Sequence, residues 1–220
     1  MNTSQIGAVL LYLPILLLSV IVHECSHGLV ALWRGDPTAK FAGRLTLNPI
    51  PHIDLYGSII LPGLLMLWNL PAFGWAKPVP VDARNFHHSY DGVLVAIAGP
   101  LSNLILGFLF AVLVASTRFM PLSVGAPAYV IGQAGLVVNC VLCLFNLLPI
   151  PPLDGHWVAL RLLPPNLARA YAHIGFMGIL LIFVLFLLPG VSDTLIGVPL
   201  RYLTGVLLHL AENLFRWIPS

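Results

Sequence analysis

The sequence predicts an all-α polytopic membrane protein, from its apolar composition, its scarcity of charge and its long hydrophobic runs. Hydrophobic residues make up 59% of the 220 residues and charged residues only 8%, whereas soluble domains carry about 25% charged residues. Nineteen prolines and nineteen glycines indicate that some membrane segments are broken or re-entrant. A net charge of +2 and three cysteines exclude a nucleic-acid-binding domain and a disulfide-stapled secreted module.

The first predicted membrane helix begins with the apolar run Ile6–Val22 and continues to Trp33. This length is enough to cross a hydrocarbon core of about 30 Å. Gly35-Asp36-Pro37 ends the helix. A cleaved signal peptide is not expected, because no Lys or Arg precedes the apolar run and no small-residue cleavage site follows it.

The next segment is expected to hold a short or re-entrant element and a small extended element. Phe41–Leu47 is predicted to form a short strand. Leu55–Leu70 contains a Pro-Gly pair and falls just short of the usual span of about 17–25 residues, so it either re-enters or crosses. Phe73–Asp82 is predicted to be extended, because its two prolines disfavour a helix.

Further membrane helices are predicted in the rest of the chain, for a total of about five to six. A single membrane-embedded domain is expected to account for residues 1–220. The predicted spans are three clear ones, Val93–Ser116, Tyr129–Leu148 and Ile174–Leu188, and a weaker one, Leu195–Trp217, which holds several polar residues.

The basic residues predict the orientation in the membrane. If the first helix ends in the cytoplasm, segments 34–90 and 149–172 together hold seven basic residues, against two on the opposite side. Both segments lie on one side only if Leu55–Leu70 enters and leaves by the same face. The prediction is therefore a multi-pass protein of a cell membrane, with this re-entrant arrangement favoured.

The first helix carries the pentad His23-Glu24-Cys25-Ser26-His27, which has the His-Glu-x-x-His pattern of zinc hydrolases. Positions i and i+4 share a helix face, so both imidazoles can reach one metal ion. Glu24 can take a proton from a water whose pKa a catalytic zinc lowers to about 7, and pass it to a leaving amine. A charged group at mid-membrane costs about 2.5–3.5 kcal/mol and usually marks a function, which argues against a merely structural polar cluster.

A catalytic zinc site needs a third protein ligand, and the best candidate is Asp154. It lies in the proline-stiffened stretch Asn146–Gly155, which follows an apolar helix. Asp154 is also suited to cap the following helix, a role compatible with metal binding. Asp54, with His52 beside it, is the alternative ligand.

Two other polar features have a structural and a functional interpretation. The Asn146 amide can donate to a developing oxyanion or form an interhelical hydrogen bond. Cys140-x-x-Cys143 has the spacing of a metal-binding pair, but within an apolar helix the two thiols are expected to serve packing.

Taken together, these motifs resemble the site-2 protease family of intramembrane zinc metalloproteases. The resemblance rests on three stretches in the family's order, His23–Gly28, Ala98–Asn103 and Asn146–Gly155. Asn48–Gly57 and Gly74–Val81 are further similar to the compact bacterial branch. The sequence departs from larger members in having no PDZ insertion and no CBS domains, so substrate selection by those domains is not carried over.

The resemblance implies one zinc ion per chain, with His23, His27 and Asp154 as ligands, Glu24 as general base and Asn146 polarising the scissile carbonyl. It implies cleavage of single-span or other transmembrane proteins within or next to their membrane segments. It also implies a bacterial inner membrane and an active site nearer the cytoplasmic side. The alternative is a non-catalytic zinc carrier or scaffold, which has no need of a base beside its ligands. The sequence assigns no oligomeric state.

Overall fold

The computed structural model describes residues 3–60, 64, 76–173, 175 and 177–218, and within them it is built from helices without any strand. An all-α polytopic fold is therefore confirmed. The α-helices are α1 (Thr3–Trp33), α2 (Thr38–Phe41), α4 (Asp91–Ser116), α5 (Leu122–Asn146), α6 (Gly155–Leu162), α7 (Pro165–Ala172), α8 (Met177–Leu187) and α9 (Val198–Leu214).

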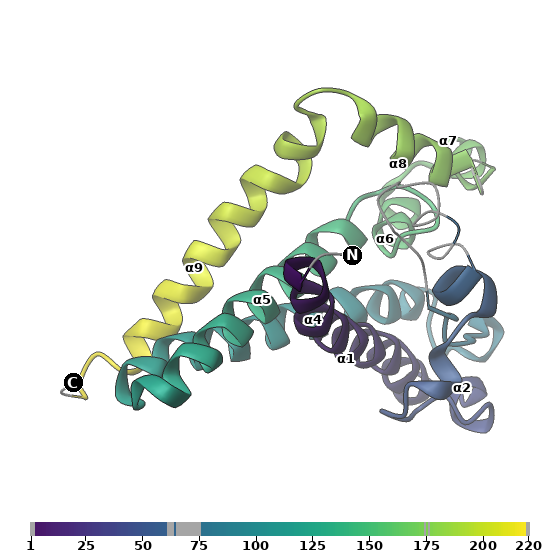
Figure 1. Ribbon diagram of the computed structural model, residues 1–220. Coiled ribbons are helices and arrows are strands. Elements are labelled where there is room, and N and C mark those ends of the chain that lie inside the picture. Colours follow the sequence, from purple (N-terminus) through teal and green to yellow (C-terminus); the bar gives the residue numbers. More distant parts are fainter. Residues whose placement is uncertain (1–2, 61–63, 65–75, 174, 176, 219–220) are drawn as a thin grey trace.

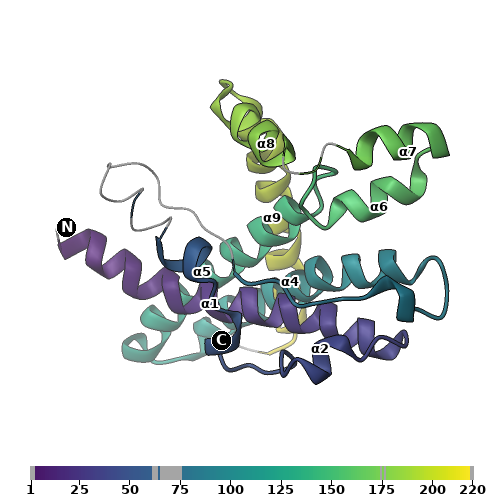
Figure 2. The ribbon, with the colours of Figure 1, turned by 90° about the vertical axis from the view of Figure 1, so that its right-hand side faces the viewer.

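Helices α1, α4 and α5 pack side by side and form the centre of the molecule, with α9 against α4 and α5 (Figures 1 and 2). Small residues on α4 and α9 allow these helices to approach closely, as is common between membrane helices. Arg118, just after α4, donates a hydrogen bond to the Phe215 carbonyl just after α9. The buried core residues at this junction are Ala111, Ala115, Leu136, Cys140, Leu207 and Ala211.

Within the described residues, four helices are long and apolar enough to cross a membrane, and a fifth crossing is possible if α7 and α8 act as one span bent by 84°. The count of four or five applies to these residues, whereas about five to six were expected for the whole chain. Within the expected span Ile174–Leu188 the structure describes α8, which has 11 residues and is about 16 Å long, so it is counted as a crossing only together with α7. The four candidate spans are Gly7–Trp33, Asp91–Phe119, Leu122–Asn146 and Asp193–Leu214.

The short strand predicted for Phe41–Leu47 is absent, because the chain there turns instead. The Asp36 carboxylate accepts hydrogen bonds from the Thr38 backbone N–H and hydroxyl, which starts the helical turn α2. Gly43 then adopts φ 64°, a left-handed conformation that interrupts a strand. Residues 76–82 are non-helical as predicted, although they pair with no strand among the described residues.

The region between α1 and α4 begins and ends at one face of the bundle. Arg34 forms a 2.7 Å ion pair with Asp91, and the His87 backbone N–H donates to the Arg34 carbonyl. A single crossing by Leu55–Leu70 would put these groups on opposite faces. Residues 55–60 form a helical turn, η2 (Leu55–Ile60); apart from residue 64, the rest of Leu55–Leu70 lies outside the described residues, as do residues 73–75 of the extended segment.

Candidate metal centre

His23, His27 and Asp154 come together at one point between α1 and the turn that follows α5. The two Nε2 atoms lie 3.0 Å apart, and Asp154 Oδ2 lies 3.2 Å from His23 Nε2 and 3.3 Å from His27 Nε2. The helical spacing that the pentad predicts places both imidazoles on one face of α1. Together with Asp154 they make a group that can hold a metal ion.

The donor set and its spacing fit zinc. Zinc–nitrogen and zinc–oxygen bonds of about 2.0–2.2 Å in a tetrahedral site put neighbouring ligand atoms about 3.3 Å apart. The three atoms here have separations of 3.0 to 3.3 Å. Asp154 Oδ2 is also buried without a hydrogen-bond donor, an arrangement that a bound cation satisfies. Two imidazoles and one carboxylate leave a fourth position open, as catalytic zinc requires.

Gly99 on α4 keeps the space beside the two imidazoles free. A Cβ atom there would lie 2.6 Å from His23 Nε2 and even closer to His27 Nε2. Any larger side chain at position 99 would therefore clash with the two imidazoles. Glycine at this position lets the α4 backbone pack directly against the site.

The other nitrogen of each imidazole is held by α4. His23 Nδ1 lies 2.6 Å from the side-chain oxygen of Asn103, and His27 Nδ1 lies 2.7 Å from the Val95 carbonyl. Each Nδ1 therefore carries the proton, so each Nε2 presents its lone pair to a metal ion.

Asn103 belongs to a buried polar network that connects three helices. Its amide nitrogen donates to the Ser19 carbonyl of α1 and to the side-chain oxygen of Asn139 on α5, at 3.3 and 3.1 Å. Asn139 in turn donates to the Gly135 carbonyl. Both asparagines are fully buried. No role for Asn139 is predicted from the sequence, although an amide in an apolar membrane helix indicates a hydrogen-bonded position.

Glu24 is held by a segment distant in sequence. The backbone N–H of Val79 donates to Glu24 Oε2 at 2.9 Å. Val79 lies in the non-helical segment 76–82, which therefore runs alongside the face of α1 that carries Glu24. Glu24 directly follows the ligand His23 in the sequence.

Two predicted candidates lie outside this group. The Asn146 amide donates to the Leu142 carbonyl of its own helix at 3.0 Å. Asp54 Oδ1 accepts from the Gly57 N–H, and the neighbouring His52 lies 2.9 Å from the Thr46 carbonyl. The geometry thus favours Asp154 over Asp54 as third ligand. Asp154 stands at the N-cap position of α6 without making a side-chain cap bond.

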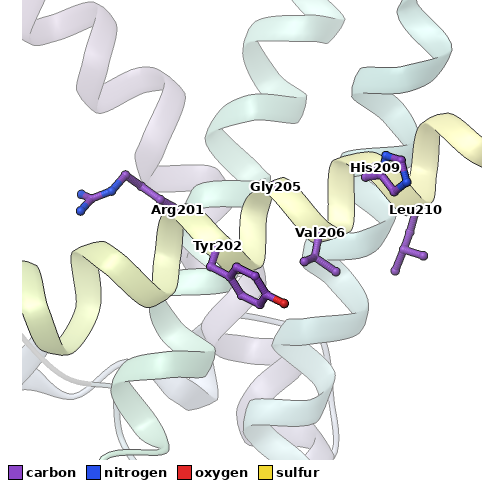
Figure 3. Close-up of a pocket in the computed structure, with 6 residues that line it drawn as sticks. All are labelled: Arg201, Tyr202, Gly205, Val206, His209 and Leu210. Atoms are coloured by element: carbon purple, nitrogen blue, oxygen red, sulfur yellow. The ribbon is translucent and has the colours of Figure 1, made fainter.

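A surface hollow lies elsewhere, on α9. It has a volume of about 370 Å³ and is open to the surroundings. All six lining residues belong to this one helix (Figure 3). His209 is the one metal-ligating type among them, so this hollow has no set of ligands. Its lining residues are Arg201, Tyr202, Gly205, Val206, His209 and Leu210.

Several known proteins are similar to this chain over most of its length, and each is named a "putative zinc metalloprotease". Identity is 41% with YwhC of Bacillus subtilis, over 79% of this chain and 78% of the relative. Identity is 30% with Rip2 of Mycolicibacterium smegmatis, over 86% of this chain and 71% of the relative. It is 33% with Rip2 of Mycobacterium tuberculosis, over 83% of this chain and 68% of the relative. No protein-family model and no solved structure matches the chain. The chain belongs to the zinc metalloprotease family that includes YwhC and Rip2.

Proposed function

We propose that this protein is an intramembrane endopeptidase of the site-2 type, which hydrolyses peptide bonds within or next to transmembrane segments. The observation that supports this most strongly is that Asp154 meets His23 and His27 at helix α1, which is itself long and apolar enough to cross the membrane. A metalloprotease centre in such a position faces substrates that share the bilayer. We propose that residues 1–220 form a single membrane-embedded metalloprotease domain.

The roles we propose are those that the resemblance to the site-2 protease family implies. His23, His27 and Asp154 would hold zinc, which when bound supplies Lewis acidity toward water and the scissile carbonyl. Glu24 accepts a proton from the attacking water and returns it to the leaving amine nitrogen. Asn146 donates its amide to the carbonyl oxygen, for which its side chain must leave the Leu142 carbonyl.

The substrate must expose its peptide bond by unwinding, and the segment 76–81 could pair with the unwound strand. Pro78 and Pro80 have no N–H, and the Val79 N–H is donated to Glu24. Because the Pro78 carbonyl accepts from Arg44, pairing in this stretch would use the Pro80 carbonyl oxygen, with an N–H group of the substrate as donor. The substrates we propose are single-span or other transmembrane proteins of a bacterial inner membrane, with water reaching the site from the cytoplasmic side.

The test is cleavage by the purified protein in detergent, with bound zinc measured in the same samples. A panel of single-span proteins is incubated with and without a chelator. We expect cleavage within or next to a membrane segment, loss of it on chelation and recovery when zinc is restored. Stoichiometric zinc without cleavage of any panel member would instead favour the carrier or scaffold.

A further inference from the structure

Two segments fold back onto the face of α1 that carries Glu24. The Arg44 backbone N–H donates to the Ala39 carbonyl, and the Cys25 thiol lies 3.1 Å from the Thr46 carbonyl. One helical turn after Glu24, a Cβ atom on Gly28 would lie 3.0 Å from Val79 Cγ1. Segments 39–46 and 76–82 therefore both pack beside the candidate base.

Arg44 joins these two segments. Its side chain is buried, with only 5% of the residue exposed. Nη2 donates to the Lys77 carbonyl at 2.5 Å and to the Pro78 carbonyl at 3.3 Å. The next residue along the chain is Val79, whose N–H holds Glu24. A continuous series of contacts thus leads from the Arg44 guanidinium to the Glu24 carboxylate.

The far end of the extended segment is fastened independently of Arg44. Asp36 Oδ2 accepts from the Asp82 N–H at 2.7 Å, and Asp36 Oδ1 accepts from the Asn85 amide at 2.8 Å. Loss of Arg44 would therefore free the carbonyl groups of Lys77 and Pro78 next to Glu24, while the Lys77 N–H stays bonded to the His52 carbonyl and residues 82–85 stay attached. This separation makes a local effect on the base distinguishable from loss of the whole loop.

We infer that Arg44 is a positioning residue for Glu24, which it acts on through the backbone of residues 77–79. The inference rests on the proposed function, in which Glu24 is the base. Hydrogen bonds from a guanidinium are charge-assisted and stronger than neutral ones. Both bonds come from Nη2, and a lysine ammonium, a more strongly hydrated point charge on a flexible stem, is less suited to this buried position. Arg44→Lys is therefore expected to behave more like Arg44→Gln than like the wild type.

The first measurement is steady-state cleavage by Arg44→Gln and Arg44→Lys. We expect kcat to fall about 10- to 100-fold, the size of effect that misplacement of a catalytic group produces. KM and bound zinc should stay at their wild-type values. Arg44→Ala should recover part of its kcat when guanidinium is added, because the ion can enter the space that the side chain leaves. The matched control is Arg118→Gln, which removes another arginine-to-carbonyl bond far from Glu24 and should leave kcat unchanged.

The second measurement does not depend on activity. Pro78 and Pro80 have no amide hydrogen, so Val79 supplies the one exchangeable amide of residues 78–80. Hydrogen exchange of this amide should be at least about tenfold faster in Arg44→Gln than in the wild type and in Arg118→Gln. Unchanged Val79 exchange, a raised KM with normal kcat, or loss of zinc would overturn the inference. Failure of the proposed function alone would show as accelerated Val79 exchange in a protein that cleaves no substrate.

Discussion

Two polar regions flank the candidate active site, and they are built in different ways. The inner region is the Asn103–Asn139 network, in which the Asn103 side chain holds the His23 imidazole. The outer region comprises residues 36–46 and 76–85, in which Asp36 and Arg44 hold extended backbone. A metal ligand is thus fixed by helix packing, and the base is fixed by a connecting segment. Substitutions in the inner region should therefore lower the affinity for zinc, whereas substitutions in the outer region should lower kcat.

The largest expected effect concerns the metal ligands themselves, one of which the inner region supports. Replacing His23, His27 or Asp154 by Ala should remove most bound zinc and abolish cleavage, because three ligands are the minimum of a catalytic site. Asp54→Ala is the matched control and should keep its zinc. Metal analysis of the purified variants is the measurement. An empty site in Asp54→Ala together with a full site in Asp154→Ala would reverse the ligand assignment.

Glu24→Gln should separate turnover from zinc binding. The amide keeps the volume of the side chain and can still accept from the Val79 N–H, but it is no longer basic. Loss of a general base typically costs about 10²–10⁴-fold in rate. Zinc content should equal that of the wild type. Wild-type cleavage at equal zinc would contradict the proposed mechanism.

Asn146→Ala should have a smaller effect on rate. If the amide donates to the developing oxyanion, its loss costs about 10²–10³-fold in kcat. Zinc content and KM should not change, because Asn146 lies outside the ligand group and bonds to its own helix in this structure. A normal kcat in Asn146→Ala would contradict the proposed oxyanion role and leave Asn146 a structural residue bonded to the Leu142 carbonyl.

Asn103→Ala should weaken zinc binding without removing it. Loss of the partner of a metal-binding histidine typically costs about 10- to 100-fold in metal affinity. Competition with a chelator of known affinity measures the change. The contrast with Arg44→Gln, which should keep its zinc affinity, tests the division between inner and outer regions. Equal zinc affinity in both variants would mean that the division is wrong.

Local sequence pattern predicted the parts of the site that depend on local geometry. The i, i+4 spacing of His23 and His27 is a property of one helix, and the proline-rich turn gave Asp154 its position. Val79 and Arg44 could not be predicted in this way, because their contacts join segments 55 and 33 residues apart. The strand expected at Phe41–Leu47 failed for a local reason instead, since the Asp36 carboxylate accepts from Thr38 and starts a helical turn there.

The smallest expected effect concerns the outer loop and its response to acid. Burial of Asp36 opposes its ionisation, but hydrogen bonds from Thr38, Asn85 and the Asp82 backbone outweigh this, so the pKa of Asp36 lies below its usual value. A carboxyl group with a lowered pKa stabilises the folded loop above its unfolded pKa of about 3.9. That stability is lost as the pH falls from there through the lower folded value.

Asp36→Asn reproduces the uncharged state at neutral pH. The substitution weakens the hydrogen bonds to residue 36, which should raise the equilibrium constant for opening of the loop about three- to tenfold. Trypsin should therefore cut after the exposed Arg84 about three- to tenfold faster than in the wild type. Asp193→Asn, which removes an exposed carboxylate paired with Arg201, is the control and should leave this cut unchanged. Zinc content should stay at its wild-type value in both. Loss of zinc in Asp36→Asn would show that the outer loop also supports the ligands, and the contrast between the two regions would no longer hold.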